Sequence, residues 1–182
     1  MKEEKVTIFK WFWGWQDDKQ EAWLEEMSQK GLHLVDIKAF GRYVFEVNPD
    51  NSFIYRMDFD WTYRKNSDYF KLIEEAGWER VITVMGWQYW RKDASNGKTA
   101  EIFTDNQSKI KKYERFLTSL LVSSPVSMLI ILLGMFKRFQ GRHPQWVIIV
   151  VISLYMAWIF FVGVNIIKVI QRINELKRMR GL

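Results

Sequence analysis

Two carboxylates, Asp58 and Asp60, stand two residues apart in an alternating segment and come closest in this sequence to a catalytic pair. Residues at i and i+2 of a strand point to the same face, so the two side chains are expected side by side, with Arg56 in the same row. Neighbouring carboxylates can share one proton or hold a divalent cation. The alternative is a solvent-exposed strand face with an internal Arg–Asp pair, and nothing else in the sequence completes a site.

Three tryptophans recur at every second residue from residue 11 to residue 15. On a strand they would form a row on one face, which could stack a flat ligand or seat in a lipid headgroup layer. They could equally build the core, because indoles bury a large apolar area in a small domain. The candidate ligand or partner surface therefore comprises Trp11, Trp13, Trp15, Arg56, Asp58 and Asp60.

Other catalytic chemistry has little support in the residue types. The chain has no cysteine, which excludes disulfides, thiolate catalysis and Cys-ligated zinc. The chain has two histidines, His33 and His143. The apolar blocks described below predict that they lie on opposite sides of a membrane, so they cannot share a metal site, and His33 is expected to be structural. Phosphate-binding, nucleophile-elbow, zinc-protease and dinucleotide motifs are absent from the sequence. We therefore expect neither enzymatic activity, a cofactor nor a metal.

The first hundred residues consist of two similar halves. Helical patterns cover residues 17–30 and 67–76, and aromatic strands precede them at residues 7–13 and 53–61. Each helix is followed by a glycine, an apolar strand, a second glycine and an aromatic strand. The matching positions are Gly31 and Gly77, Val35 and Val81, Gly41 and Gly86, and Phe45 and Trp90. This repeat predicts an α+β domain of two β-α-β-β units, with an antiparallel sheet and both helices on one face.

The composition changes beyond Ser108. Two uncharged blocks follow, residues 116–136 and 146–167, of 21 and 22 residues. As helices they would extend roughly 31 to 33 Å, against a hydrocarbon core of about 30 Å. We therefore expect an α+β domain over residues 1–108, and over residues 109–182 a two-helix transmembrane hairpin with a basic C-terminal tail.

Charge is divided in the same way as hydropathy. The net charge of +6 arises beyond Ser108, where 12 Lys and Arg face 2 Asp and Glu; residues 1–108 hold 15 against 19. Nucleic-acid binding needs basic residues on the folded domain, so it is not expected, whereas a lipid bilayer suits basic flanks. Nine Lys and Arg lie outside the hairpin and three in its connecting loop. This bias predicts a protein of the cell membrane with two spans and both termini cytoplasmic.

Small residues form a stripe on each apolar block, and neither block contains Asp, Glu, Lys or Arg, which argues against a channel or pump. Such stripes let helices approach closely. They could pack the hairpin on itself or contact a partner, including a second copy of the chain. The candidate helix-packing face comprises Ser119, Ser123, Ser127, Ser153 and Ala157.

Several segments spread over residues 6–110 together resemble the bacterial family known as domain of unknown function 2812. The segments are Phe9-Lys-Trp-Phe12, Trp23-Leu-Glu-Glu-Met27, Phe45-Glu46, Tyr55-Arg-Met-Asp58, Glu75-Ala-Gly-Trp78, Gly86-Trp-Gln-Tyr-Trp90 and Phe103-Thr-Asp105. Leu32 and Trp90 depart from the family pattern by apolar or aromatic exchanges. The resemblance implies a protein of Gram-positive bacteria, often with C-terminal membrane helices and often encoded beside a PadR-like regulator. It implies no catalytic residues.

A membrane anchor joined to an aromatic-rich domain without a catalytic motif suggests a membrane-anchored regulatory or sensory accessory protein. Its cytosolic domain would bind a protein partner or a small ligand. One alternative is an accessory subunit of a transporter or envelope-stress complex, which the serine stripe would favour. A second is a membrane-associated enzyme that uses Asp58 and Asp60 as acids.

Overall fold

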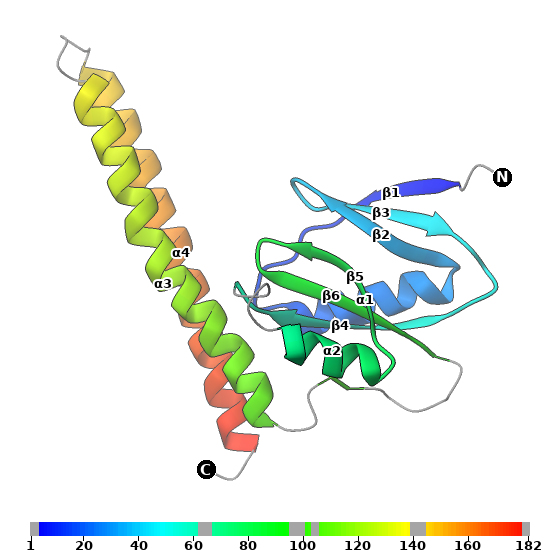
Figure 1. The fold of residues 1–182 in the computed structure, drawn as a ribbon. Helices are drawn as coiled ribbons and strands as arrows, with labels where there is room; N and C mark the ends of the chain where they lie inside the picture. The colour runs from blue at the N-terminus through cyan, green and yellow to red at the C-terminus, as the bar shows by residue number, and fades with distance from the viewer. Residues whose placement is uncertain (1–3, 62–66, 95–100, 103–105, 139–144, 180–182) are drawn as a thin grey trace. The chain divides into compact units, whose positions relative to one another are not determined.

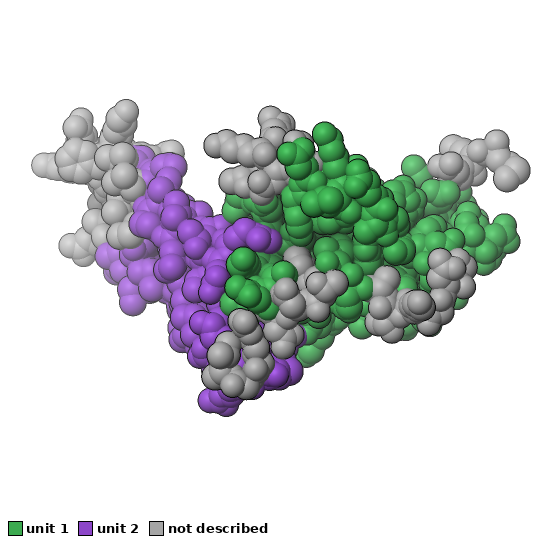
Figure 2. All heavy atoms as spheres, turned by 60° about the horizontal axis from the view of Figure 1, so that its bottom comes forward, with its two compact units in different colours: residues 1–112 green, residues 113–182 purple. Residues whose placement is uncertain are grey.

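The computed structural model describes the chain except for residues 1–3, 62–66, 95–100, 103–105, 139–144 and 180–182 (Figure 1). The chain divides into two compact units, residues 1–112 and 113–182 (Figure 2). This division lies close to the boundary predicted after Ser108. His143 and most of the loop predicted between the two spans lie outside the described residues.

The first unit is an α+β domain, as predicted, and its two halves repeat the order β-α-β-β. Its elements are β1 (Lys5–Phe9), α1 (Asp17–Gln29), β2 (Leu32–Lys38), β3 (Arg42–Val47), β4 (Phe53–Phe59), α2 (Ser67–Glu75), β5 (Glu79–Val84) and β6 (Trp87–Asp93). The halves also agree in detail, because the strand register shifts around Val35 in the first and around Val81 in the second. These are two of the positions that the sequence repeat matches.

The expectation of one sheet with both helices on one face is wrong. The strands form two antiparallel sheets, ordered β1-β3-β2 and β4-β6-β5. A strand of the first half cannot join the outer edge of β4, because side chains of α1 bond to the backbone there. Trp23 of α1 packs on Phe45 of β3, so α1 contacts the first sheet as well as the β4 edge of the second. Phe70 of α2 packs on Trp90 of β6.

Short turns, residues 39–41 and 85–86, join the last two strands of each half. Phe40 and Met85 have φ of 63° and 49°, and the glycine after each also has positive φ. A side chain at Gly41 would meet the backbone, since an added Cβ would lie 2.5 Å from the carbonyl oxygen of Lys10. Glycine is therefore required at that position, whereas Phe40 and Met85 adopt a conformation that bulky residues rarely adopt.

Two long helices make up the second unit. Helix α3 (Asn106–Arg138) begins in the first unit and continues into the second, where α4 (Gln145–Met179) lies beside it (Figure 1). Arg172 Nε donates a hydrogen bond of 3.4 Å to the Tyr113 hydroxyl. The buried residues of α4 recur every three or four positions, which is the spacing of a helix–helix seam. They are Asn165, Val169, Ile173 and Leu176.

Within the described residues, one helical stretch, Ile149–Met179, is long and apolar enough to cross a membrane. Its large apolar side chains, such as Leu154 and Phe160, are exposed, whereas a core helix of a soluble protein would bury them. The stretch therefore suggests membrane anchoring. A second span over residues 116–136 stays a prediction.

Candidate functional site

The outer edge of β4 is closed by polar side chains of α1. Glu21, Glu25 and Ser28 are three or four residues apart and so share one face of the helix. Every second N–H of β4 points outward from the sheet, which brings these donors to that face. The bonds run from Phe53 N to Ser28 Oγ (2.7 Å), from Tyr55 N to Glu25 Oε1 (3.4 Å) and from Met57 N to Glu21 Oε1 (2.8 Å).

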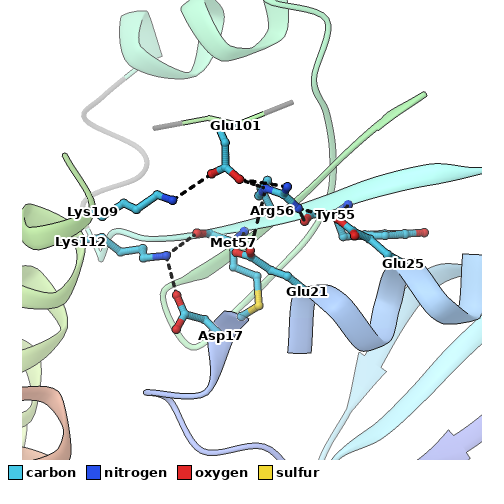
Figure 3. Close-up of polar contacts among 9 residues, drawn as sticks. All are labelled: Asp17, Glu21, Glu25, Tyr55, Arg56, Met57, Glu101, Lys109 and Lys112. Carbon is cyan, nitrogen blue, oxygen red and sulfur yellow. Dashed lines mark hydrogen bonds and ion pairs between the residues drawn. The ribbon is translucent and has the colours of Figure 1, made fainter. Parts of the chain in front are cut away.

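Lys112 extends this edge from the first turns of α3. Its Nζ lies 2.5 Å from Asp17 Oδ2 and 3.2 Å from the carbonyl oxygen of Met57, and the side chain is buried (Figure 3). Burial lowers the pKa of Lys112, but the carboxylates of Asp17 and Glu21 outweigh it and raise that pKa above its ordinary value. Lys112 is therefore a buried cation that joins α3 to α1 and β4 within the first unit.

Glu21 is the carboxyl group of this edge whose proton affinity changes most. Burial raises its pKa from 4.5 to about 7, and the negative charge of Asp17 adds to that effect. Lys112, the backbone N–H of Met57 and Arg56 act in the opposite direction. A carboxyl group with this pKa changes between its protonated and ionised forms near neutral pH.

Arg56 is enclosed by carboxylates rather than presented as a free surface. Its guanidinium lies 2.5 Å from Glu25 Oε1 and 3.0 Å from Glu101 Oε1 (Figure 3). Glu101 also pairs with Lys109 at 3.1 Å. Arg56 thus belongs to the same structural network as Lys112, and the prediction of an Arg–Asp pair along β4 is wrong.

Asp58 and Asp60 do not lie on a solvent-exposed face. They are 0% and 3% exposed, and α2 contacts Asp58 on this face through Tyr69. One Asp58 oxygen accepts a bond from Phe59 N at 2.7 Å, and the other accepts the Tyr69 hydroxyl at 3.1 Å. Alternation of residue types predicted the side-chain directions but not that both faces of β4 are covered.

His33 is structural, as predicted. Its ring nitrogens lie 3.2 Å from Ser28 Oγ and 2.7 Å from the carbonyl oxygen of Asn48. Among the residues that the structure describes, no group of three or more His, Cys, Asp or Glu is placed to hold a metal ion.

The tryptophan row does not lie on a strand, because β1 ends at Phe9 and the three indoles follow in the connection to α1. Trp13 stacks on Trp15 at 5.2 Å between ring centroids, and Trp11 meets Trp13 edge to face at 5.9 Å. Trp11 is 52% exposed. Trp11 and Trp13 contribute to the wall of a cavity in the first unit.

That cavity, of about 270 Å³, lies between the two sequence halves and is lined largely by aromatic and aliphatic side chains. The β1–α1 connection, the turn before β3 and the turn before β6 each contribute to it. Its main apolar lining residues are Trp11, Phe12, Trp13, Ile37, Phe40, Met57, Val84, Met85 and Trp87. A concave apolar site with a few polar groups is the usual form of a small-molecule site.

The polar groups of the cavity are Gln20, Tyr43 and Tyr89, with Lys38 also in the lining. Gln20 Nε2 donates to the Tyr43 hydroxyl at 2.8 Å and to the Tyr89 hydroxyl at 2.9 Å. Burial raises the pKa of Tyr43 to about 12, and burial with the neighbouring Tyr43 raises the pKa of Tyr89 further. Both phenols therefore stay protonated at neutral pH.

Phe40 and Met85 border the cavity from equivalent turns of the two halves, and they are 77% and 78% exposed. Sequence analysis missed them together with the polar trio. A signal was available, because each stands directly before the glycine of a predicted turn, where Asn or Asp is the ordinary choice. Strained conformations of this kind cluster at ligand clamps and switch regions.

The predicted helix-packing stripe is divided between two environments. Ser123, Ser153 and Ala157 are exposed on the outside of the helix pair, whereas Ser119 and Ser127 are partly buried. The Ser119 and Ser153 hydroxyls bond to carbonyls of their own helices, at 2.7 and 2.8 Å. Ser153 and Ala157 therefore form an exposed face of small residues on α4, where another helix could approach closely. A partner for that face stays a prediction.

Comparison with known proteins gives one match. A family model described as "Protein of unknown function (DUF2812)" matches residues 16–124, more than half of the 182-residue chain. The matched region covers most of the first unit and continues into α3. No curated protein and no solved structure matches the chain.

Proposed function

The chain belongs to the family of proteins of unknown function DUF2812, and on that premise we propose that it is a membrane-anchored, non-enzymatic sensory accessory protein. Its first unit binds a small ligand. The observation that carries this proposal is the half-open aromatic cavity with Gln20, Tyr43 and Tyr89 among its lining residues. A polar trio among apolar walls fixes a ligand's orientation as well as its affinity.

The lining favours binding over catalysis. Its polar side chains are an amide, two phenols that stay protonated and the ammonium of Lys38, with neither a carboxylate nor an imidazole among the described lining residues. General acid–base catalysis near neutral pH depends on a group whose pKa lies near the working pH. Glu21 has such a pKa, but its carboxylate bonds to the β4 edge rather than lining the cavity.

A sensory role is supported by residues that belong to both the cavity and the α3 contact. Met57 is one of the residues that line the cavity, and its carbonyl accepts the bond from Lys112 of α3. Gln20 lines the cavity from the same turn of α1 that carries Asp17, the ion-pair partner of Lys112. A ligand that moves α1 or Met57 therefore alters the contacts that hold the beginning of α3.

The apolar stretch of α4 supports membrane anchoring, and we propose two spans. The described part of α3 exposes Leu121, Val122, Val126 and Ile130, a set of apolar side chains that water would not favour. Two helices joined by a short segment would cross as a hairpin. The excess of Lys and Arg on the two outer flanks of the apolar blocks supports a cytoplasmic first unit and cytoplasmic termini.

The binding proposal is tested by ligand-observed NMR on the full chain in detergent micelles, with a library of small neutral aromatic compounds. We expect saturation-transfer signals for several compounds with wild type. Ala39→Trp should abolish them, because this side chain would grow into the cavity from its lining.

Ala76→Trp is the matched control, because Ala76 is exposed near the end of α2 and does not line the cavity. Its binding signals should equal those of wild type. Signals that persist in Ala39→Trp, or are lost in both variants, would contradict the cavity as the binding site.

A further inference from the structure

The lining of the cavity specifies more than a small ligand. We infer that it takes a flat, uncharged aromatic molecule of one or two fused rings, whose carbonyl-type oxygen accepts hydrogen bonds from both Tyr43 and Tyr89. This inference rests on the proposed function and names the ligand class of the same site. It depends on hydrogen-bond capacity, charge and wall shape.

Hydrogen-bond capacity requires an acceptor on the ligand. Gln20 gives both amide hydrogens to the two phenol oxygens, so each oxygen already accepts a bond while its own O–H remains a donor. Among the described residues, neither O–H hydrogen has an acceptor. Both oxygens lie within 2.9 Å of one nitrogen, so they are close enough for a single carbonyl oxygen, with its two lone pairs, to receive both hydrogens.

Charge favours a neutral molecule. The negative charge of Asp17 contributes to the raised pKa of Tyr89, so this charge acts on the phenol and would also repel an anion bound there. A cation would meet the donor end of two O–H groups and the ammonium of Lys38 in the lining. The described lining offers a cation no complementary charge. It offers an anion only the exposed Lys38, against the negative charge of Asp17 that acts on Tyr89.

Wall shape favours one or two flat rings. Indoles of Trp11, Trp13 and Trp87 line the cavity, and aromatic faces prefer offset stacking or edge contact with another ring. The volume of about 270 Å³ lies just below the range of drug-sized sites. Met57 and Met85 complete the wall with flexible, polarisable thioethers, which adapt to a ring edge.

Four probes of similar size separate these requirements: coumarin, a neutral lactone with a carbonyl; naphthalene, without an acceptor; 2-naphthoate, an anion; and a naphthylmethyl trimethylammonium cation. Affinities are measured by ligand-observed NMR titration of the full chain in nanodiscs. We expect coumarin to bind at least about tenfold more tightly than naphthalene, because it receives two hydrogen bonds. Naphthoate and the cation should bind more weakly than coumarin.

The double variant Tyr43→Phe with Tyr89→Phe removes both donors and keeps the rings. We expect coumarin to fall to the affinity of naphthalene, while naphthalene itself binds unchanged, which also shows that the variant is folded. If both probes weaken equally, or if naphthoate or the cation binds more tightly than coumarin, the ligand class is wrong although a binding cavity remains. Failure of all four probes to bind would overturn both the ligand class and the proposed function.

Discussion

At the scale of single residues, Glu21 shows how burial changes the proton affinity of a carboxyl group. Its pKa of about 7 in the folded protein compares with 4.5 for an unperturbed side chain, and burial is the largest cause. Below pH 4.5 the group is protonated whether the chain is folded or unfolded. Between pH 4.5 and 7 only the folded protein keeps the proton, so the free energy of unfolding falls as pH rises. Above pH 7 the whole penalty, about 3 kcal/mol, is present.

Glu21→Gln should remove this penalty, because the amide is a neutral isostere of the protonated acid. We expect the free energy of unfolding to rise by up to about 3 kcal/mol at pH 8 and to change little at pH 4. Denaturant unfolding of the full chain in detergent, followed by tryptophan fluorescence, measures both values.

Glu26→Gln is the control for this substitution in the same helix. The Glu26 side chain is more than half exposed, and its bond with Lys30 lowers its pKa, so the substitution should slightly reduce stability at neutral pH. A gain of stability that is the same at pH 4 and pH 8 in Glu21→Gln would rule out ionisation as its cause.

At the scale of elements, the two strained turns place exposed apolar side chains at the border of the cavity. Phe40→Asn and Met85→Asn should each stabilise the protein by about 1 kcal/mol, because Asn adopts positive φ more readily than either residue. The same substitutions should weaken binding of an aromatic ligand, since the covering side chain is lost. Thermal unfolding and ligand titration of each variant measure the two effects.

Met85→Leu separates the two contributions of this turn, because leucine keeps the apolar contact and the unfavourable φ. It should leave both stability and binding close to wild type. Stabilisation by leucine equal to that by asparagine would show that strain is not the cause.

Periodicity in the sequence predicted most elements of the first unit but not how they combine. The repeated glycines located both helix ends and both hairpin turns, because these positions need positive φ. The tryptophan row suggested a longer first strand, since an i, i+2 spacing does not show where pairing ends. The contact between the polar side chains of α1 and the edge of β4 could not be predicted. It depends on side chains three or four residues apart on a helix of the first half reaching alternate N–H groups of a strand in the second half. The burial of Asp58 could not be predicted either, since α2 contacts it through Tyr69.

At the scale of the whole molecule, helix α3 belongs to both units. Its beginning is held in the first unit by the buried Lys112–Asp17 pair, and its later part contains the first predicted span, residues 116–136. Removing one partner of this buried pair would cost several kcal/mol, because the other charge would be left buried and unpaired. The distribution of charge agrees with membrane anchoring, because the excess Lys and Arg lie beside the apolar blocks, where they favour anionic lipid.

Membrane topology distinguishes two spans from one, and the absence of cysteine makes single-cysteine labelling clean. With two spans and cytoplasmic termini, Gly141→Cys should react with an impermeant maleimide in intact cells, whereas Asn51→Cys and Leu182→Cys should react only after lysis. If α4 alone crosses, one of two other patterns appears. Either Leu182→Cys alone is labelled, with the first unit inside, or Asn51→Cys and Gly141→Cys are labelled together, with the first unit outside. Equal labelling of all three variants after lysis is the control for accessibility.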